Sequence, residues 1–289
     1  MYKHKQRHNF QDRKNSSIFA IRKFHNQIKR QMINESVDFL RENYNTVDIK
    51  LLDLSCGTGG DCFKWFDSGI MTVIGFDISE SSITEAKKRY AELLNTLRRK
   101  GVTNLPDYKF YVMDLSDSNN LHKISRIIGD TKFDIVSCQF AIHYFFKSPE
   151  TLNTFMTIAS SYINKNAFFI GTTMSGNSIK QLFQTNNIIQ NDIFKITNNT
   201  KDFTSPYNNQ YTVALGKESD TDHYFAGKDS IEYLVDIEEL KKVADKFNLM
   251  FIGKTEFSEW STKLNEKQLT DADKEFSFLN FSFVFMPKR

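Results

Sequence analysis

A glycine-rich turn between two apolar segments constrains the fold of this chain more than any other feature. Residues 49–54 form an apolar segment that runs straight into Ser-Cys-Gly-Thr-Gly-Gly-Asp, and a later apolar segment ends on Asp77, 20 positions past Gly57. This order is half of a nucleotide-binding α/β unit, which consists of a strand, a glycine turn, a helix and a second strand that ends on an acid. Glycines let the backbone approach a ligand, and the acid can accept both hydroxyls of a ribose.

The turn differs from the dinucleotide-binding pattern G-x-G-x-x-G, because its glycines are Gly57, Gly59 and Gly60. A turn lined by backbone, without the pyrophosphate fingerprint, favours an adenosine carried on a sulfonium, and therefore S-adenosylmethionine, over NAD. We predict that Asp53, two residues before the turn, is buried and hydrogen-bonds the turn amides. We interpret Asp77 as the ribose acceptor, with a helix N-cap as the alternative.

The rest of the chain alternates apolar strands with helical patterns, which indicates a mostly parallel sheet covered by helices on both faces. The expected strands, seven in all, are residues 49–54, 72–77, 109–113, 133–139, 167–172, 249–253 and 279–286. The expected helices are residues 16–44, the segment from the turn to about residue 69, 79–99, 121–128, 151–162 and 237–247. Together these elements predict an α/β, Rossmann-like fold.

Composition and local bias suggest how the chain is organised. Of 289 residues, 40% are hydrophobic and 25% are charged, as in ordinary globular chains, and the net charge of +3 does not by itself indicate a nucleic-acid partner. We predict that residues 1–15 form a basic flexible arm and that residues 16–289 form the folded domain. Within that domain, about residues 185–230 are rich in asparagine and predict a small inserted antiparallel lid.

The cysteines and the apolar runs exclude several classes of protein. Cys56, Cys62 and Cys138 have no metal-ligand spacing, so we expect small buried side chains, no metal site and a reducing intracellular compartment. No apolar run approaches the length that a bilayer-spanning helix needs.

Several polar residues fall where the ligand-binding edge of the sheet is expected. Asp114 closes the third strand, where it either meets an adenine amine or caps a helix. Gln139 closes the fourth strand, and His143 and Tyr144 follow it. Glu232 lies in an apolar stretch and therefore needs a partner. That partner is either a structural cation or a ligand with two adjacent N–H donors, such as the Watson–Crick edge of guanine.

Five motifs resemble, in this order, those of the eukaryotic and viral mRNA cap guanine-N7 methyltransferases, and the resemblance covers nearly the whole chain. They are IRKFHNQIK (21–29), LLDLSCGTGGDCFKW (51–65), GFDISESSITEAKKRY (75–90), CQFAIHYFF (138–146) and SIEYLVD (230–236). The motif Q-F-x-x-H-Y is specific by itself. The other motifs are specific only through their order and spacing. The resemblance implies a class I S-adenosylmethionine-dependent methyltransferase fold, and it also fits the methyltransferase domain of a viral capping enzyme.

The resemblance implies a role for each matching residue. Lys29 would hold the methionine carboxylate of the donor, and Gln139 would lie by its sulfonium. The residues implied to bind the donor are Lys29, Asp53, Gly57, Asp77, Ile78, Asp114, Leu115 and Gln139. The residues implied to bind the cap are Asn26, Lys64, Arg89, His143, Tyr144, Glu232 and Phe281, and the first three of these would lie toward the cap nucleotide and its phosphates.

Five positions depart from the family's motifs. Thr58 stands where the family has lysine, and His25 stands where it has asparagine. Ser55 replaces a glycine, Met174 a proline, and Phe281 the tyrosine that faces the cap. These departures bear on cap affinity and phosphate contacts, and they leave the donor-binding residues intact.

The implied reaction is methylation of N7 of the guanine cap of mRNA, from GpppN to m7GpppN. Because N7 carries a lone pair and no proton, transfer needs no general base and no catalytic residue. It requires in-line positioning of the reacting atoms about 3–3.5 Å apart. The alternatives are a class I methyltransferase with a different acceptor and an inactive partner subunit with the same fold.

The implied partner is the capped 5′ end of mRNA, together with triphosphatase and guanylyltransferase domains in cis or in trans. We expect no membrane partner. We expect a soluble intracellular protein, cytoplasmic if viral and nuclear if cellular. The asparagine-, lysine- and isoleucine-rich character favours a viral origin.

Overall fold

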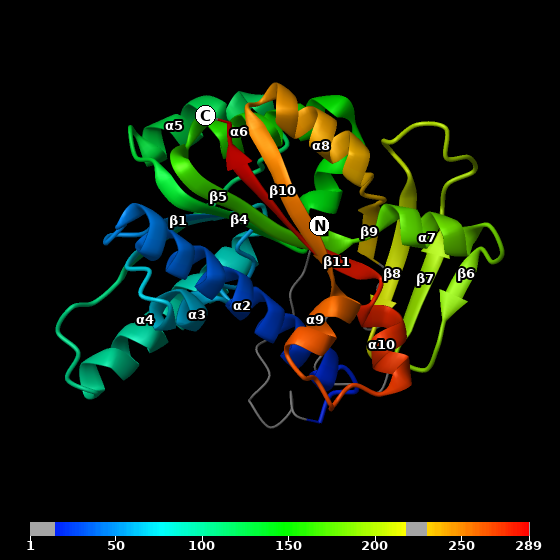
Figure 1. Cartoon of the computed structure of the whole chain (residues 1–289), viewed down its shortest axis with the longest axis horizontal. Helices are drawn as coiled ribbons and strands as arrows, with labels where there is room; N and C mark the ends of the chain where they lie inside the picture. The colour runs from blue at the N-terminus through cyan, green and yellow to red at the C-terminus, as the bar shows by residue number, and fades with distance from the viewer. Residues whose placement is uncertain (1–14, 218–229, 289) are drawn as a thin grey trace.

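The computed structural model describes residues 15–217 and 230–288, so residues 1–14 of the expected basic arm lie outside the described residues. Two sheets organise the described part of the chain, a large one at the centre and a smaller one beside it (Figure 1). The large sheet has seven strands in the order β10-β11-β5-β4-β1-β2-β3. Their bounds are β1 Lys50–Leu54, β2 Thr72–Asp77, β3 Asp107–Val112, β4 Phe133–Gln139, β5 Ile163–Met174, β10 Leu249–Glu256 and β11 Asn280–Pro287.

The large sheet is mostly parallel, as predicted. The strands from β5 to β3 pair in parallel, and β11 runs antiparallel to both of its neighbours, β5 and β10. Burial on both faces explains the continuous apolar runs of β1 and β4. The carboxyl ends of five strands therefore meet at one edge, where ligands of such sheets bind.

Helices cover both faces of the large sheet, in two layers that Figure 1 separates above and below the strands. One layer contains α2 (Phe19–Tyr44), α3 (Cys62–Asp67), α4 (Glu80–Arg99) and α9 (Phe257–Lys263). The other contains α5 (Leu121–Ile128), α6 (Pro149–Ser161) and α8 (Ile237–Lys246). The side chain of Ser79 accepts a hydrogen bond from the amide of Ser82 and caps the N-terminus of α4.

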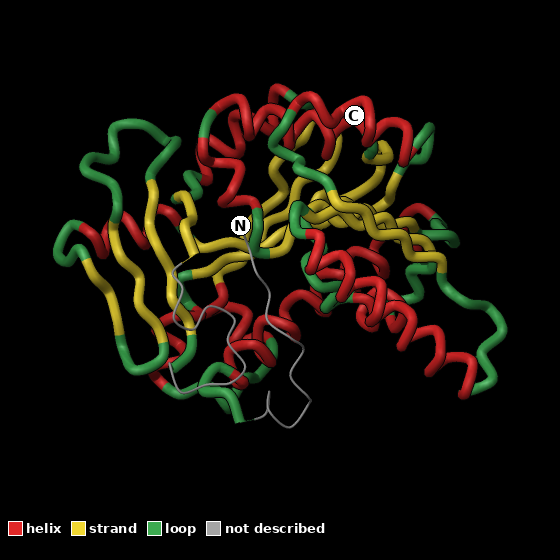
Figure 2. The backbone as a smooth tube through the Cα atoms, turned by 180° about the vertical axis from the view of Figure 1, so that it is seen from behind, coloured by secondary structure: helices red, strands yellow, loops and turns green. Residues whose placement is uncertain are grey.

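The smaller sheet is the predicted antiparallel insertion, and Figure 2 shows its strands side by side at one end of the molecule. It has four strands, β6 (Ile188–Gln190), β7 (Phe194–Asn198), β8 (Gln210–Leu215) and β9 (Ser230–Tyr233). The insertion extends three residues beyond its predicted end, because β9 completes the sheet. This extension makes Glu232 a residue of the small sheet.

Short helices were not predicted from the sequence. These are α7 (Gly176–Phe183), α9, α10 (Asp271–Ser277), and two 3-10 helices, η1 (Ser118–Asn120) and η2 (Ile142–Lys147). Helices of eight residues or fewer make about two turns, so the apolar period is weak in them. Helices α7 and α10 contribute to a third apolar cluster beneath the small sheet. Across the described residues, we find no helix with the length and hydropathy needed to cross a membrane.

Candidate functional site

The glycine turn folds back over the end of β2. The amides of Ser55 and Cys56 both donate to the carbonyl of Phe76, at 3.0 and 2.8 Å. Gly57 and Gly59 have φ angles of 52° and 69°, in the region that favours glycine. A Cβ on Gly59 would lie 2.9 Å from the Cα of Ala86, whereas a Cβ on Gly57 would meet nothing within 4 Å. Gly59 thus allows α4 to pack against the turn, and Gly57 borders open space.

Asp77 holds the turn. Its carboxylate accepts the amide of Gly57 at 2.8 Å and the amide of Ser79 at 2.9 Å. These contacts correct the prediction for Asp53, which was expected to bind the turn amides. Asp53 is buried inside β1, and its Oδ1 has no hydrogen-bond partner among the described residues. Burial, reinforced by the nearby Asp61, raises the pKa of Asp53 well above its usual range.

Lys29, Asp61 and Lys64 form a compact ion network beside the turn. The amine of Lys29 donates to both oxygens of Asp61, at 2.8 and 2.9 Å, and the amine of Lys64 donates to Oδ1 at 2.6 Å. Burial alone would raise the pKa of Asp61, but the two lysines outweigh it and hold that pKa below its usual range. The side chain of Lys29 remains 15% exposed, and it therefore reaches the surface of the network.

The three residues expected near the cap phosphates lie in different surroundings. Lys64 is only 6% exposed and also donates to the carbonyl of Gly60, so its amine is directed to the turn and does not form an open phosphate contact. Asn26 is exposed on α2, where its amide donates to the carbonyl of Arg22. The guanidinium of Arg89 lies 3.4 Å from where a Cβ on Gly60 would be. Arg89 thus lies close to the turn, where it also pairs with Glu85 of its own helix at 3.4 Å.

Beyond β2, the remaining donor-site candidates occupy neighbouring strand ends. Ile78 is 62% exposed and follows Asp77 directly. The carboxylate of Asp114 accepts the amide and the hydroxyl of Ser116, at 2.8 and 2.6 Å. This contact stabilises the local turn. It therefore resembles the predicted capping role of Asp114 more than a contact with adenine. Leu115 is 4% exposed and belongs to the main apolar cluster, so only its backbone is placed to meet a ligand.

At the end of β4 the chain turns sharply. The amide oxygen of Gln139 accepts the hydroxyl of Thr172 on β5, at 3.0 Å. Phe140 follows with a φ angle of 55°, which is unusual for a bulky residue, and its ring stacks on the imidazole of His25 at a centroid distance of 5.2 Å. His25 therefore joins α2 to the end of β4. Burial, followed in size by the charge of Lys29, lowers its pKa from 6.5 to about 3.

A second group of polar side chains lies where the small sheet meets η2. Glu232 on β9 is 7% exposed, and its Oε2 accepts the hydroxyl of Tyr211 at 2.8 Å. His143 on η2 is 4% exposed, and its Nε2 lies 3.8 Å from the same oxygen without a hydrogen-bond partner among the described residues. Burial lowers the pKa of His143, although Glu232 opposes the shift. The hydroxyl of Tyr144 lies 3.4 Å from that of Ser230.

Phe281 does not offer the open stacking face that was expected. It is 1% exposed on β11, among the large buried aromatic rings of the core, and the amine of Lys254 lies 5.4 Å from its ring centroid. The alternation of β11 explains this position, because Phe281, Phe283 and Phe285 share one buried face of the sheet.

Sequence reasoning assigned no role to Asp61 or Tyr211. Asp61 ends the G-G-D of the glycine-rich motif, so its position was a usable signal. Tyr211 pairs directly with Glu232 across the β8–β9 ladder, a contact that no local pattern reveals. Within the described residues, no cluster of histidine, cysteine and acidic side chains is arranged to hold a metal ion, and Cys56, Cys62 and Cys138 are free and buried.

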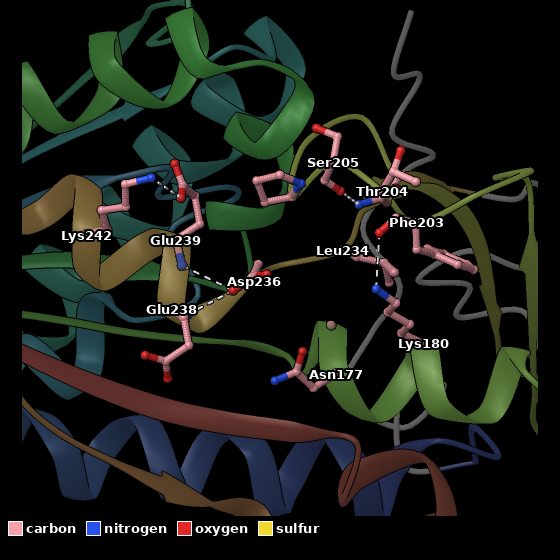
Figure 3. A pocket seen from close by; sticks show the side chains of 13 residues that line it. Asn177, Lys180, Phe203, Thr204, Ser205, Leu234, Asp236, Glu238, Glu239 and Lys242 are labelled. Carbon is pink, nitrogen blue, oxygen red and sulfur yellow. Dashed lines mark hydrogen bonds and ion pairs between the residues drawn. The ribbon is translucent and has the colours of Figure 1, made fainter.

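Two cavities lie away from the glycine turn. One, of about 400 Å³, separates α7 from the start of α8, and Figure 3 shows Asn177 and Lys180 across from Asp236 and Glu238. The other, of about 670 Å³, lies between the loop before β8 and the end of η2, and Lys147 and Gln210 are among its lining residues. Neither cavity is lined by Asp77 or Glu232.

Comparison with known proteins gives a family match along most of the chain. The family model described as "mRNA (guanine-N(7))-methyltransferase domain" matches residues 1–276. A curated mRNA cap guanine-N(7) methyltransferase of Schizosaccharomyces pombe is 30% identical over 84% of this chain and 63% of its own length. The protein of the same name from Drosophila melanogaster is 28% identical over 86% of this chain and 57% of its own length. The chain thus spans roughly 60% of the length of these two relatives.

Solved structures share the fold at low sequence identity. A S-adenosylmethionine-dependent methyltransferase from Clostridium acetobutylicum has a TM-score of 0.55 at 16% identity, over 89% of this chain and 91% of that one. The CcbJ methyltransferase from Streptomyces caelestis has a TM-score of 0.56 at 12% identity, over 89% of this chain and 90% of that one. These likenesses support the predicted class I methyltransferase fold. The relatives named here are from eukaryotes, so the expectation of a viral origin is not supported.

Proposed function

Because the chain belongs to the mRNA (guanine-N7)-methyltransferase family, we propose that it transfers the methyl group of S-adenosylmethionine to N7 of the guanine cap of mRNA. The observation that supports the proposal is that this chain carries two groups of polar side chains, one at the carboxyl end of β2 and the other where the small sheet meets η2, the helix that follows β4. One group is Asp77 with the glycine turn, and the other is Glu232 with Tyr211 and His143.

The residues around the turn fit the donor. Gly57 borders open space, Asp77 presents a carboxylate there, and the amine of Lys29 reaches the surface of its ion network. In this proposal Asp77 accepts the ribose hydroxyls while it keeps its two backbone contacts, since each carboxylate oxygen has a second lone pair. Lys29 pairs with the carboxylate of the methionine part. When bound, the donor supplies an electrophilic methyl group on a sulfonium.

The second group fits a guanine. Glu232 accepts the two adjacent N–H donors of the Watson–Crick edge, and His143, kept neutral by burial, donates one N–H to O6. The charge of Glu232 also favours the positive charge that develops on the ring during transfer. In this proposal Gln139, the last residue of β4, lies toward the sulfonium. The residues orient two reactants, and none of them removes a proton.

A labelled-methyl assay tests the proposal directly. The protein is incubated with GpppA-capped RNA and methyl-labelled S-adenosylmethionine, and the digested cap is resolved by chromatography. Label should appear as N7-methylguanine, and neither ApppA-capped nor uncapped RNA should accept it. Label on a ribose hydroxyl, or transfer to an acceptor without guanine, would assign the chain a different activity.

The absence of a general base has a consequence for the pH profile. Since N7 carries no proton, the single-turnover rate should stay level from neutral to mildly alkaline pH. A tenfold rise per pH unit, tracking one deprotonation, would show that a side chain removes a proton and would contradict the mechanism.

We further propose that the partner is the capped 5′ end of mRNA, with triphosphatase and guanylyltransferase domains acting in cis or in trans before this step. The methyl transfer requires a GpppN end, and those two activities make one from a 5′-triphosphate. Co-purification of such activities with the chain from its own cells, in the nucleus for a cellular protein, tests this part.

A further inference from the structure

Tyr211 and Glu232 form a cross-strand pair in which one residue can act on the substrate through the other. Both side chains are buried, at 1% and 7% exposure, and they lie directly opposite each other in the β8–β9 ladder. The phenol hydroxyl is 2.8 Å from Oε2 of Glu232. Residues opposite each other on one face of an antiparallel pair are held by the backbone register, so this contact has a fixed geometry.

The hydroxyl can serve only as a donor toward the carboxylate. Burial, with the charge of Glu232 second, raises the pKa of Tyr211 well above its usual range, so the phenol keeps its proton. Hydrogen bonding to the charged form of a carboxylate favours that form. His143, the other titratable group on this carboxylate, is too far for a hydrogen bond at 3.8 Å. Among the described contacts, the hydroxyl of Tyr211 is therefore the group that donates a hydrogen bond to the Glu232 carboxylate.

The same hydroxyl also reaches the large sheet. It lies 3.7 Å from Sδ of Met174, the last residue of β5. The position of the hydroxyl thus depends on two strands, on β9 through Glu232 and on β5 through Met174. A shift of the small sheet relative to β5 would disturb both contacts. The hydroxyl is therefore placed to set the position of the carboxylate relative to the edge of the large sheet.

We propose that Tyr211 is a positioning residue for guanine recognition, an inference that rests on the proposed function. Its hydroxyl occupies one lone pair of Oε2 and fixes the carboxylate plane. Oε1 and the remaining lone pair of Oε2 are then directed at the two N–H groups of the purine. Tyr211 would thereby make the site require the exocyclic amine of guanine, without touching the base.

Tyr211→Phe removes only the hydroxyl and keeps the ring that fills the core. We expect KM for GpppA-capped RNA to rise about 10-fold, with a smaller change in kcat, because a hydrogen bond to a charged group is lost. Donor affinity, measured by calorimetry, should stay unchanged.

Discrimination against an inosine cap supplies a second readout. Inosine lacks the exocyclic amine, so wild type should use IpppA-capped RNA much less well than GpppA-capped RNA. Tyr211→Phe should reduce that ratio about threefold or more, because its carboxylate is no longer fixed on the two donors. In a Glu232→Gln background, adding Tyr211→Phe should change nothing further.

Tyr207→Phe is the matched control. Its hydroxyl donates to Glu239 at 2.7 Å, a similar tyrosine–glutamate pair outside the site. This variant should keep the wild-type KM and the wild-type discrimination against inosine. Wild-type behaviour of Tyr211→Phe, or full additivity with Glu232→Gln, would overturn the positioning role. If wild type does not methylate capped RNA at all, the proposed function fails instead. Thermal melting of each variant separates loss of folding from both outcomes.

Discussion

At the scale of single residues, the carboxylates of this site differ in what they bind. Asp77 accepts the amide of Gly57 in the turn and the amide of Ser79 at the start of α4. Asp53, two positions before the turn, is buried, with Oδ1 unpaired among the described residues. Asp61 is shared by two lysines, and Glu232 is held by a phenol. Each environment makes a different substitution informative.

Asp77→Asn should weaken donor binding by about 10- to 100-fold, because an amide has only one accepting atom and no charge. The amide of Gly57 or that of Ser79 would lose its acceptor, and the ribose would lose an anionic partner. Titration calorimetry with S-adenosylhomocysteine measures the effect. Asp67→Asn is the control, because Asp67 lies in α3 and is half exposed in an ion pair with Arg30. Equal affinity in both variants would remove the ribose role of Asp77.

Ser55→Gly should stabilise the protein by about 1 kcal/mol or more, measured as the free energy of unfolding in denaturant. Ser55 has a φ angle of 112°, a backbone conformation that side chains disfavour. The related family has glycine there, and the conformation explains that preference. A loss of stability would mean that the serine side chain compensates for the strain.

At the scale of elements, the turn between β1 and α3 does two separate things. Gly59 lets α4 approach, and Gly57 leaves space above the backbone. The end of β4 is tied to β5, because the side chain of Gln139 accepts the hydroxyl of Thr172 and the amide of Phe140 donates to the carbonyl of Thr172. Parallel strands place all these ends at one edge.

Gly59→Ala and Gly57→Ala should separate folding from binding. Alanine at position 59 meets Ala86 at 2.9 Å with a positive φ, so it should cost about 2–4 kcal/mol of stability. Alanine at position 57 should cost only about 1 kcal/mol, since nothing is in its way, but its methyl group would project where the donor binds. Thermal melting and donor calorimetry on both variants check this contrast. Undiminished donor affinity in Gly57→Ala would place the donor elsewhere.

At the scale of the whole molecule, His25 connects parts that are far apart in the sequence. Its ring stacks near Phe140 and Phe276 and meets the edge of Phe257, and Nε2 lies 3.1 Å from the hydroxyl of Ser277. It therefore ties α2 to the end of β4 and to the C-terminal helices α9 and α10. A charge on this ring would be costly, which is consistent with its lowered pKa.

The stability of the protein in acid should depend on the lowered pKa of His25. The pKa of His25 is about 3 in the folded protein and 6.5 in the unfolded chain. Between pH 3 and pH 6.5, the unfolded chain therefore binds a proton at this imidazole that the folded protein does not bind. Stability from this residue is therefore present above about pH 6.5 and is lost as the pH falls toward 3. His25→Phe should reduce the fall in Tm over that interval by several degrees. His122→Gln, at an exposed position, should leave the slope unchanged, and an unchanged slope in both would contradict the assignment.

By itself, the sequence determined the parallel sheet, the glycine turn, the Asp77 strand end and the antiparallel insertion. These features depend on local periodicity and on backbone angles that glycine permits, which nearby residues specify. Only the tertiary structure decided that Asp77 binds the turn amide, that Lys64 and Lys29 share Asp61, and that Tyr211 holds Glu232. Those contacts join residues from separate elements, and their energies depend on burial and register that arise only when the elements pack together.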